Sequence, residues 1–387
     1  MNQDSQLIAR ACSSFGDIDQ QAWDACACAD GYNPFITYNF LSSLEDSGSA
    51  TLDTGWLGQH MLFEQDGTLV GAIPCYLKNH SYGEYVFDHG WADALERAGG
   101  DYYPKLQVSV PFTPATGRRL LTSKTADRAK LLPLMSATLG ELCSQTRASS
   151  VHITFLADDE WLTTGETGYL KRIDQQFHWQ NDSYHTFDDF LSALSSRKRK
   201  AIRKERRTAL ENGISVELLT GTELKEEHWD AFFGFYIDTG SRKWGSPYLT
   251  RTFFSLIGER MADDILLIMA KRDGRYIAGA LNFIGSETLF GRNWGCIEDH
   301  PCLHFELCYY QAIEWAIANR RTFVEAGAQG AHKLARGYQP VQTRSAHWIA
   351  NPSLRRAVDD YLDRERFHVE QEQKILARHT PFRKDTI

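Results

Sequence analysis

The chain has 387 residues, of which 42% are hydrophobic and 12% aromatic, and its formal net charge at pH 7 is −8. This composition excludes a disordered chain, and the length predicts two domains, because one hydrophobic core seldom grows beyond about 250 to 300 residues. The negative charge argues against broad nonspecific binding to nucleic acid. No apolar run is long enough to predict a transmembrane segment, and the N-terminus MNQDSQLIARACSSFGDID lacks a secretory signal pattern, so we expect a cytoplasmic protein.

The eight cysteines predict neither a disulfide framework nor a metal site. They are scattered along the chain without a CxxC pair, and only Cys26 and Cys28 lie close together, flanked by alanines. Such spacing, without histidine or cysteine partners at zinc-site distances, is typical of free thiols in a reducing compartment. We therefore predict no metal, and we expect Cys26 and Cys28 to pack as small apolar residues.

The first half of the chain predicts a hairpin followed by a strand, a helix and another strand. Residues 61–78, MLFEQDGTLVGAIPCYLK, contain an apolar strand, a turn at Asp66-Gly67 and a longer apolar strand. An Asp-Gly pair favours the left-handed conformations of a tight hairpin turn. The other expected elements are a helix before the hairpin (37–47) and, after it, an extended segment (103–112), a helix (127–146) and a strand (150–156).

The second half repeats this order. Residues 268–285, IMAKRDGRYIAGALNFIG, predict a second hairpin with its turn at Asp273-Gly274. The surrounding expected elements are two helices before it (226–235 and 250–261) and a strand (287–296), a helix (303–318) and a strand (322–327) after it. We therefore predict an α/β (α+β) fold of two tandem domains, 1–176 and 177–350, each a mixed sheet flanked by helices.

A strongly basic segment opens the second predicted domain. Residues 197–207, RKRKAIRKERR, hold eight lysines or arginines and one glutamate in eleven positions. A capping box at Thr186 and a stop at Asn212-Gly213 predict a helix, although Ser195 or Ser196 can also start a second helix there. Like charges four residues apart each cost a helix about 0.2 to 0.5 kcal/mol, so we favour an anionic ligand over a merely solvated face.

The end of the chain predicts a charged C-terminal helix and tail, residues 351–387. Asn351-Pro352 has the pattern of an N-cap and first turn. An apolar stripe follows, for which we expect packing against the body of the protein, with partner binding as the alternative. The stripe consists of Leu354, Val358, Tyr361 and Leu362.

The tandem order of elements resembles the GNAT acyltransferase superfamily. Two such units joined through SRKRKAIRKERRTALENGI, residues 196–214, resemble the Fem family, the peptidyl transferases that add amino acids from aminoacyl-tRNA to peptidoglycan precursors. The matching residues are the Ile202-Arg203-Lys204 core of the basic helix, its terminal Gly213, and the spacing of Lys333 and Gly337. Between residues 34 and 348 the chain is most similar to a FemAB-like branch labelled for peptidoglycan biosynthesis or recognition, but His332 and Arg336 stand where the family has phenylalanines.

The resemblance implies an acyltransferase that moves an aminoacyl or acyl group onto an amine of an anionic small-molecule or nucleotide-linked acceptor, such as a peptidoglycan precursor. It implies no required cofactor and aminoacyl-tRNA as a donor. Acetyl-CoA is the less favoured donor, because neither residues 293–306 (NWGCIEDHPCLHFE) nor residues 110–121 (VPFTPATGRRLL) contain a glycine-rich pyrophosphate loop. Arg118 and Arg119 remain candidates for phosphate contact.

Residues 325–340, EAGAQGAHKLARGYQP, hold the candidate catalytic groups. Acyl transfer to an amine needs a proton acceptor and donors for the developing oxyanion. We expect Lys333 to polarise a carbonyl or bind a carboxylate, and Glu325 or His332 to accept the proton. The alternative is an ordinary ion pair between Glu325 and Lys333.

The other expected substrate-binding residues lie in three regions. For the strand at 292–295, the alternative is an Arg292-Trp294 stack that serves stability, and for the Trp244 loop the alternative is packing. The regions and residues are the basic helix (Arg199, Arg203 and Lys204), the strand at 292–295 (Arg292 and Trp294), and loops (Trp244, Gln329 and Tyr338).

Two other functions fit the same fold. One is CoA-dependent N-acylation of a small molecule. The other is a non-catalytic module that recognises RNA or the cell wall, whose RNA affinity would fall steeply with salt.

Overall fold

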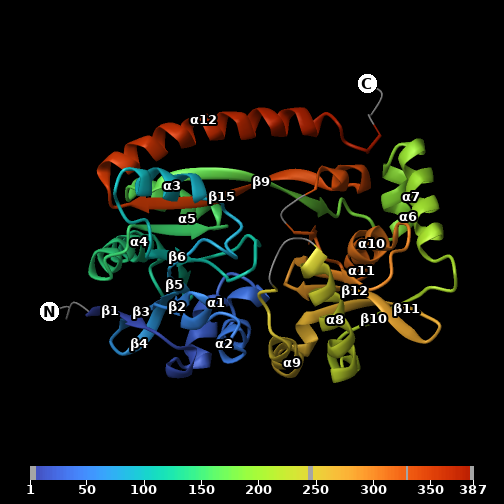
Figure 1. The fold of residues 1–387 in the computed structure, drawn as a ribbon, viewed down its shortest axis with the longest axis horizontal. Helices are drawn as coiled ribbons and strands as arrows, with labels where there is room; N and C mark the ends of the chain where they lie inside the picture. Colours follow the sequence, from blue (N-terminus) through green and yellow to red (C-terminus); the bar gives the residue numbers. More distant parts are fainter. Residues whose placement is uncertain (1–5, 243–246, 328–329, 384–387) are drawn as a thin grey trace. The chain divides into compact units, whose positions relative to one another are not determined.

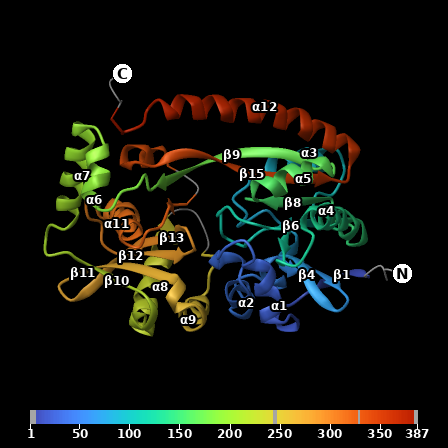
Figure 2. The same cartoon turned by 180° about the vertical axis from the view of Figure 1, so that it is seen from behind.

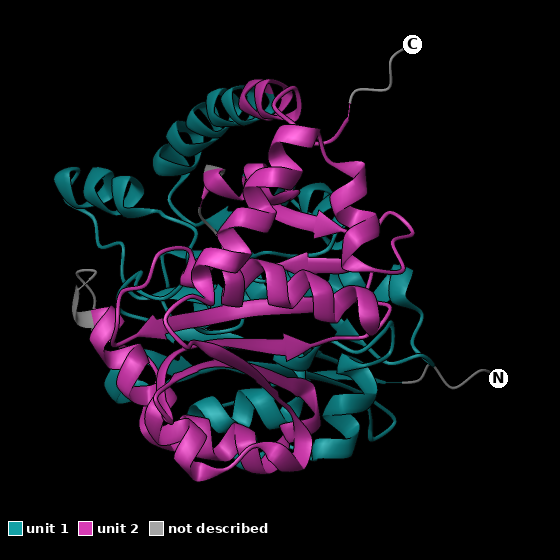
Figure 3. Ribbon diagram, turned by 90° about the vertical axis from the view of Figure 1, so that its right-hand side faces the viewer, with its two compact units in different colours: residues 1–174, 342–370 teal, residues 175–341, 371–387 magenta. Residues whose placement is uncertain are grey.

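The structure is a computed structural model that describes residues 6–242, 247–327 and 330–383. The chain forms two compact units, each built from two separate segments (Figure 3): residues 1–174 and 342–370 form unit 1, and residues 175–341 and 371–387 form unit 2. The chain changes unit within β9 (Leu170–Gln180), β15 (Gln339–Ile349) and the C-terminal helix α12 (Pro352–Ala377). Residues 342–350, assigned to the second domain on sequence grounds, belong to unit 1, where β15 pairs antiparallel with β8.

Unit 1 contains two groups of paired strands (Figure 1). One is a four-stranded sheet in the order β1-β3-β4-β7, and the other pairs its strands in the order β2-β5-β6-β8-β15. β6 and β8 pair in parallel, whereas the neighbours β1-β3, β3-β4, β4-β7, β2-β5, β5-β6 and β8-β15 pair antiparallel. The strands are β1 (Leu7–Cys12), β2 (Trp56–Gly58), β3 (His60–Gln65), β4 (Thr68–Ile73), β5 (Cys75–Lys78), β6 (Lys105–Val108), β7 (Leu121–Thr122) and β8 (Ser150–Thr154), and the helices are α1 (Gln20–Ala27), α2 (Tyr38–Asp46), α3 (His89–Arg97), α4 (Arg128–Gln145) and α5 (Asp158–Glu166).

The predicted hairpin of unit 1 is confirmed in its turn and corrected in its second strand. Asp66 and Gly67 have φ angles of 51° and 78°, the left-handed conformations that the Asp-Gly pair predicts. The long second strand is divided at Pro74 into β4, which pairs with β3, and β5, which pairs with β2 and β6. Proline has no N–H to donate to a ladder, so the strand changes partners there.

Unit 2 has one mixed group of strands in the order β10-β11-β12-β13-β14-β9. β13 and β14 pair in parallel, and the others pair antiparallel. The strands are β10 (Ser215–Leu219), β11 (Ile265–Arg272), β12 (Arg275–Ile284), β13 (Thr288–Cys296) and β14 (Phe323–Glu325), and the helices are α6 (Phe187–Ala193), α7 (Ser196–Ala209), α8 (Glu226–Arg242), α9 (Arg251–Arg260), α10 (Leu303–Phe305), the π-helix η6 (Glu306–Tyr310), α11 (Gln311–Ala318) and the 3₁₀ helix η7 (Ala331–Arg336).

Helices cover both faces of the unit 2 sheet. Figure 2 shows α8 and α9 on one side of β11–β13 and α11 on the other. α8 packs so closely that a Cβ on Gly295 of β13 would lie 2.3 Å from the carbonyl oxygen of Phe235. On the opposite face, α11 and α6 bury a large apolar cluster that includes Phe190, Leu307 and Ile313. Each unit therefore has the predicted hairpin, strand, helix and strand, closed by one parallel pair, which confirms the tandem arrangement.

The basic segment forms two helices, as the alternative N-cap predicted. Thr186 caps α6 and exchanges hydrogen bonds with Asp189, and α7 begins after Ser195. α7 ends before Asn212 and Gly213, whose φ angles are 61° and 73°. Ile202 and Ala209 are its buried residues, so the remaining surface of this helix is free to carry charge.

The C-terminal helix α12 packs on unit 1 through three of its four predicted stripe residues. Leu354, Val358 and Leu362 are buried with Trp91 of α3 in one apolar cluster. Tyr361 is 44% exposed, which corrects the prediction for that residue. Tyr361 is adjacent to Leu362, and a step of about 100° around a helix carries it away from the packed stripe.

Candidate functional site

The segment after β14 depends on three glycines. Gly327, Gly330 and Gly337 have φ angles of 73°, 123° and 90°. A Cβ on Gly330 would lie 2.4 Å from His332, and one on Gly337 would lie 2.7 Å from the ring of Phe190. A side chain is excluded at both positions by conformation and by space. The glycines therefore permit the backbone path on either side of η7.

This path buries the side chain of Lys333. Lys333 is 1% exposed, and its Nζ donates a hydrogen bond of 2.8 Å to the carbonyl oxygen of Gly327. Within the described ranges Lys333 has no carboxylate partner, so the alternative of an ion pair with Glu325 is not realised. Burial lowers the pKa of Lys333 to about 8. A buried ammonium without a counter-charge is costly, and a pKa lowered in this way makes Lys333 a candidate functional residue.

Glu325 ends β14 opposite His178 of β9, a neighbour that sequence reasoning missed. The two residues are register partners, and Nδ1 of His178 lies 3.7 Å from Oε1 of Glu325. Burial, with a contribution from the charge of Lys333, lowers the pKa of His178 to about 4. His178 is therefore neutral near pH 7. Only the antiparallel register of β9 with β14 brings it to the site, and no motif in the sequence marks that pairing.

His332 is exposed on η7 and hydrogen-bonded to Tyr309, another residue that the sequence did not indicate. Nε2 of His332 and the hydroxyl oxygen of Tyr309 are 2.9 Å apart. Burial raises the pKa of Tyr309, whereas burial and the charges of Arg336 and Lys333 lower the pKa of His332. Both groups are therefore neutral near pH 7, and the imidazole of His332 retains the capacity to accept a proton.

Arg292 stands at an irregularity of β13. Asn293 pairs with Leu281 and Gly291 pairs with Asn282, which leaves Arg292 as the extra residue of a β-bulge. The parallel pairing of β13 with β14 ends two residues earlier, where Phe290 is opposite Glu325. Arg292 and Glu325 thus lie at the same end of the paired strands, a placement that is frequent for residues of functional sites.

Trp294 and Tyr338 both pack within unit 2. The ring of Trp294 meets His304 edge to face, with ring centroids 5.1 Å apart. Tyr338 is fully buried, and its ring lies 5.5 Å from that of Tyr309. Its role as a substrate-binding residue stays a prediction. The two other predicted binding residues, Trp244 and Gln329, lie outside the described residues.

The basic helix α7 is joined to the rest of unit 2 at two points. Arg206 forms ion pairs with Glu306 at 2.9 Å and with Glu314 at 2.6 Å, and the side chain of Glu306 is fully buried. Glu205, the one acid in the basic run, accepts hydrogen bonds from Arg336 of η7 at 2.9 Å and from Tyr310. These contacts make α7 a fixed neighbour of the Lys333 segment.

The π-helix η6 supplies the partners for these contacts. A continuous helix was predicted over 303–318, but its middle turn is a π-helix of five residues. Three of these five residues form hydrogen bonds with other elements: Glu306 with Arg206 of α7, Tyr310 with Glu205 of α7, and Tyr309 with His332 of η7. π-turns are rare and occur preferentially at functional sites.

The charges of α7 are mostly uncompensated. Of the predicted anion-binding residues, Arg203 pairs with Asp188 at 3.0 Å, while Arg199 and Lys204 have no ion pair in the described part of the chain. The same holds, within those residues, for Arg197, Lys198, Lys200 and Arg207. Beside the helix is a pocket of about 350 Å³, whose lining includes Arg203 and Arg206 together with their ion-pair partners Asp188 and Glu314.

The arginines of unit 1 do not form the phosphate site left open by the sequence. Arg119 is 1% exposed and donates to the carbonyl oxygens of Ala115 and Thr154. Arg118 pairs with acidic side chains, Asp30 at 2.6 Å and Asp159 at 3.0 Å. The buried carboxylate of Glu160 accepts the backbone N–H groups of residues 119 and 120, so an internal anion already occupies the donors that a phosphate would need.

The chain has two mixed-sheet units in tandem, and each contains one parallel strand pair, β6-β8 in unit 1 and β13-β14 in unit 2. This arrangement is the fold of a tandem GNAT-like protein. A family model described as FemAB-like, peptidoglycan biosynthesis or recognition, matches residues 14–384. The chain therefore belongs to the FemAB-like family.

Solved structures with a similar fold have little sequence in common with this chain. The crystal structure of FemX is 12% identical, with a TM-score of 0.55 over 92% of this chain and 100% of that one. L-PGS from Bacillus licheniformis is 11% identical, with a TM-score of 0.50 over 92% and 99%. A conserved protein of unknown function from Bacteroides thetaiotaomicron is 10% identical, with a TM-score of 0.52 over 88% and 100%. At these identities the likeness shows the fold alone.

A search of the curated proteins found no match to this chain. In the described ranges, none of the helices combines the length and the apolar character needed to cross a membrane.

Proposed function

We propose that the protein is a Fem-like acyltransferase that forms an amide on an amine of an anionic acceptor, with a peptidoglycan precursor as the acceptor and aminoacyl-tRNA as the donor. The observation that supports this most directly is Lys333, a buried ammonium group whose Nζ donates to the carbonyl oxygen of Gly327 and which has no carboxylate partner in the described residues. Family membership points the same way, since the family description names peptidoglycan.

The proposed reaction uses the groups around Lys333. The acceptor amine attacks the ester carbonyl of the donor, a C–N bond forms, and negative charge develops on the carbonyl oxygen. The ammonium of Lys333 stabilises this charge while it remains protonated, which its pKa of about 8 allows near neutral pH. His332 or Glu325 accepts the proton that the amine loses. The ester C–O bond then breaks, and the alcohol of the donor leaves with a proton.

The acceptor charge is assigned to α7. Arg199 and Lys204 lack ion-pair partners among the described residues, and Arg203 and Arg206, which pair with Asp188 and Glu314, line the neighbouring pocket. A cluster of uncompensated cations on an acidic protein attracts phosphate or carboxylate groups. Arg336 and Glu205 connect this helix to the Lys333 segment, so an acceptor held at α7 would be held near the proposed transfer site within the same unit.

CoA as the donor is not favoured by any observation. In unit 1 the backbone donors of residues 119 and 120 are occupied by Glu160. In unit 2 the corresponding segment has no glycine-rich turn, and Cys302, with a φ angle of 65°, leads directly into α10.

The proposal is tested by a donor-by-acceptor screen read by mass spectrometry. Purified protein is incubated with charged tRNA or acetyl-CoA, and with a nucleotide-linked muropeptide or simple amines. The expected result is an acceptor heavier by one aminoacyl residue, formed only with charged tRNA. An acetylated product formed only with acetyl-CoA would establish the CoA-dependent alternative. RNA or muropeptide binding without turnover under any donor would identify a recognition module.

Neutralising α7 is expected to weaken acceptor binding without changing chemistry. The change Arg199→Gln with Lys204→Gln removes two exposed or half-buried cations that make no ion pair among the described residues. We expect KM for the acceptor to rise about tenfold and to lose part of its salt dependence, with kcat unchanged. The control is Lys225→Gln with Arg275→Gln, which removes the same charge from exposed positions elsewhere in unit 2. Equal effects of the two pairs would show only a general electrostatic contribution.

A further inference from the structure

The loop between β5 and α3 in unit 1 alternates buried and exposed residues. Ser81, Glu84, Val86 and Asp88 are buried, whereas the intervening aromatic residues face solvent. We call these exposed residues the aromatic face: Tyr82 (64% exposed), Tyr85 (36%), Phe87 (61%) and the neighbouring His89. Four solvent-facing rings within eight consecutive residues, three in the loop and the fourth at the start of α3, are unusual, because large apolar side chains that cluster on a surface generally mark a binding site.

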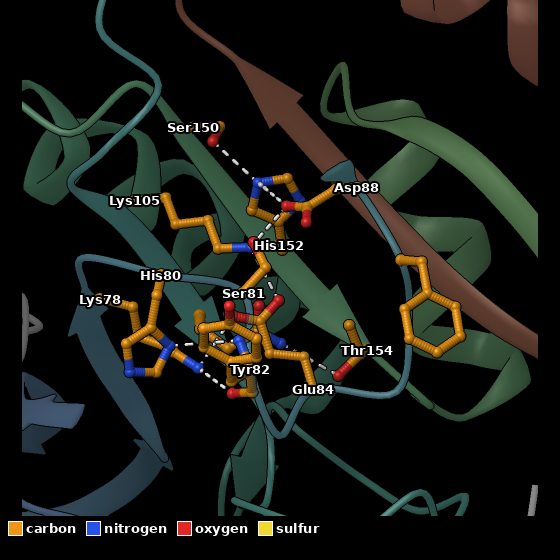
Figure 4. Close-up of polar contacts among 12 residues, drawn as sticks. Lys78, His80, Ser81, Tyr82, Glu84, Asp88, Lys105, Ser150, His152 and Thr154 are labelled. Atoms are coloured by element: carbon orange, nitrogen blue, oxygen red, sulfur yellow. Dashed lines mark hydrogen bonds and ion pairs between the residues drawn. The ribbon is translucent and has the colours of Figure 1, made fainter. Parts of the chain in front are cut away.

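Two buried lysines hold this loop from beneath. Nζ of Lys105 donates to Ser81 at 2.7 Å, to Glu84 at 2.7 Å and to Asp88 at 2.5 Å. Nζ of Lys78 donates to the carbonyl oxygen of Tyr82 at 2.7 Å, and it pairs with Glu84 at 3.0 Å. Figure 4 shows both lysines directed toward the loop from neighbouring strands. The buried residues of the loop are thus anchors for the exposed rings.

Two residues of the loop have left-handed backbone conformations. Tyr85 has a φ angle of 61°, which is sterically unfavourable for a bulky side chain. Gly83 has a φ angle of 80°, and a Cβ there would lie 2.6 Å from the ring of Phe112. The carbonyl oxygen of Phe87 accepts a hydrogen bond of 2.8 Å from Arg172. Such strain persists where the surrounding structure holds it, and it is concentrated at ligand-binding positions.

The charges near the aromatic face exclude a polyanion as its ligand. The cations that contact the loop among the described residues are Lys78, Lys105 and Arg172, and their side chains are at most 9% exposed. Each is paired with a carboxylate, Glu84, Asp88 or Glu365. Single-stranded nucleic acids and anionic membranes are bound where aromatic residues are combined with exposed cations. The aromatic face offers rings, two phenol hydroxyls and one imidazole without such cations.

We propose that the aromatic face is a binding site for a neutral oligosaccharide. The C–H groups on one face of a pyranose ring form a flat apolar surface that stacks on an aromatic ring, and the sugar hydroxyls exchange hydrogen bonds with phenol and imidazole groups. A rigid loop keeps the entropic cost of presenting these rings low. The proposal does not rest on the proposed transferase activity, since it uses residues of unit 1 that take no part in the transfer site.

The test is binding of chitotetraose, a neutral tetramer of N-acetylglucosamine, to the full chain. Calorimetry gives the affinity, and saturation-transfer NMR identifies the sugar protons that contact the protein. We expect the strongest transfer to protons on one pyranose face. Tyr82→Ala and Phe87→Ala are each expected to weaken binding about tenfold, the equivalent of about 1.4 kcal/mol of lost stacking. Both side chains are exposed, so circular dichroism and the urea midpoint should not change.

Phe367→Ala is the matched control, because Phe367 is 60% exposed on α12, nearly as much as Phe87. Unchanged binding in this variant, together with weakened binding in the loop variants, supports the proposal. The absence of binding to the wild-type protein at 10 mM chitotetraose (about the weakest affinity of interest) overturns it. Equal loss in Phe367→Ala also overturns it. Loss of oligo-dT binding in Phe87→Ala without any saccharide binding would instead make the loop a nucleobase platform.

Discussion

Replacing Lys333 with methionine is expected to abolish aminoacyl transfer and to leave the protein at least as stable as before. Methionine has a similar length and an apolar end, so it fills the 1% exposed position of Lys333 without a buried charge. The one hydrogen bond lost is that to the carbonyl oxygen of Gly327. We expect the transfer rate to fall by at least about a thousandfold, as when an oxyanion donor is removed. The measurement combines single-turnover transfer with urea unfolding.

The pH dependence of the same variant separates a catalytic role from a structural one. The pKa of Lys333 is about 8 in the folded protein against 10.5 for an ordinary lysine, so the unfolded chain holds this proton more tightly. The folded wild-type protein therefore gains stability as pH rises from about 8 to 10.5, and Lys333→Met should lack that gain. Wild-type transfer should decline above pH 8 as the ammonium is lost. Lys225→Met, at an exposed lysine of unit 2, is the control. Normal transfer by Lys333→Met would remove this residue from the mechanism.

Replacing Lys105 with methionine is expected to destabilise unit 1 by about 3 to 5 kcal/mol, because it leaves buried carboxylates without their main partner. The side chain of Lys105 is fully buried between Glu84 and Asp88, which are each 2% exposed. Burial disfavours the charge of Lys105, but the two carboxylates together outweigh burial and raise its pKa. Burial likewise tends to raise the pKa of Asp88, and Lys105 reverses this and holds it well below its usual value. The loss is measured by urea unfolding.

Acid pH and a compensating variant test the cause of that loss. Because the folded pKa of Asp88 lies below 3.8, its contribution to stability is present above about pH 4 and is lost as pH falls through the folded value. The difference between wild type and Lys105→Met should therefore shrink below pH 4. Adding Glu84→Gln and Asp88→Asn should restore part of the stability at neutral pH. Lys124→Met, at an exposed lysine, should have almost no effect. A deficit that is independent of pH would indicate a packing defect instead.

The repeated architecture was accessible from the sequence because its signals are local. The turns at Asp66 and Asp273 have φ angles of 51° and 50°, and the chemistry of an Asp-Gly pair determines such turns. Ser195 separates α6 from α7 by its place before a run of strong helix formers. Pro74 is a local signal for the division of the long strand, but the partners that β5 takes after it lie elsewhere in the chain. Pairing partners far apart in the chain leave no local signal.

The burial of charged residues was harder to predict from the sequence than the repeated architecture. Lys78, Lys105 and Arg119 are 1% exposed or less, although lysine and arginine are expected at the surface. Their partners lie in other segments, so no short pattern announces them. In the candidate site, Lys333 and Glu325 were identified from the glycine-rich segment. His178 was not, because it reaches the site only through the register of β9 with β14. Tyr309 depends on the π-turn, which shifts the helical periodicity by one residue.

The way the chain is threaded through its two units limits how the protein can be dissected. Unit 1 needs residues 342–370 in addition to its first 174 residues, and β15 supplies the antiparallel neighbour of β8. A fragment that stops at residue 174 would leave the backbone N–H and C=O groups on one edge of β8 unpaired. Such an exposed edge favours intermolecular association. Isolating either unit for ligand studies therefore requires a linker that joins its own two segments in place of the chain between them, rather than a simple truncation.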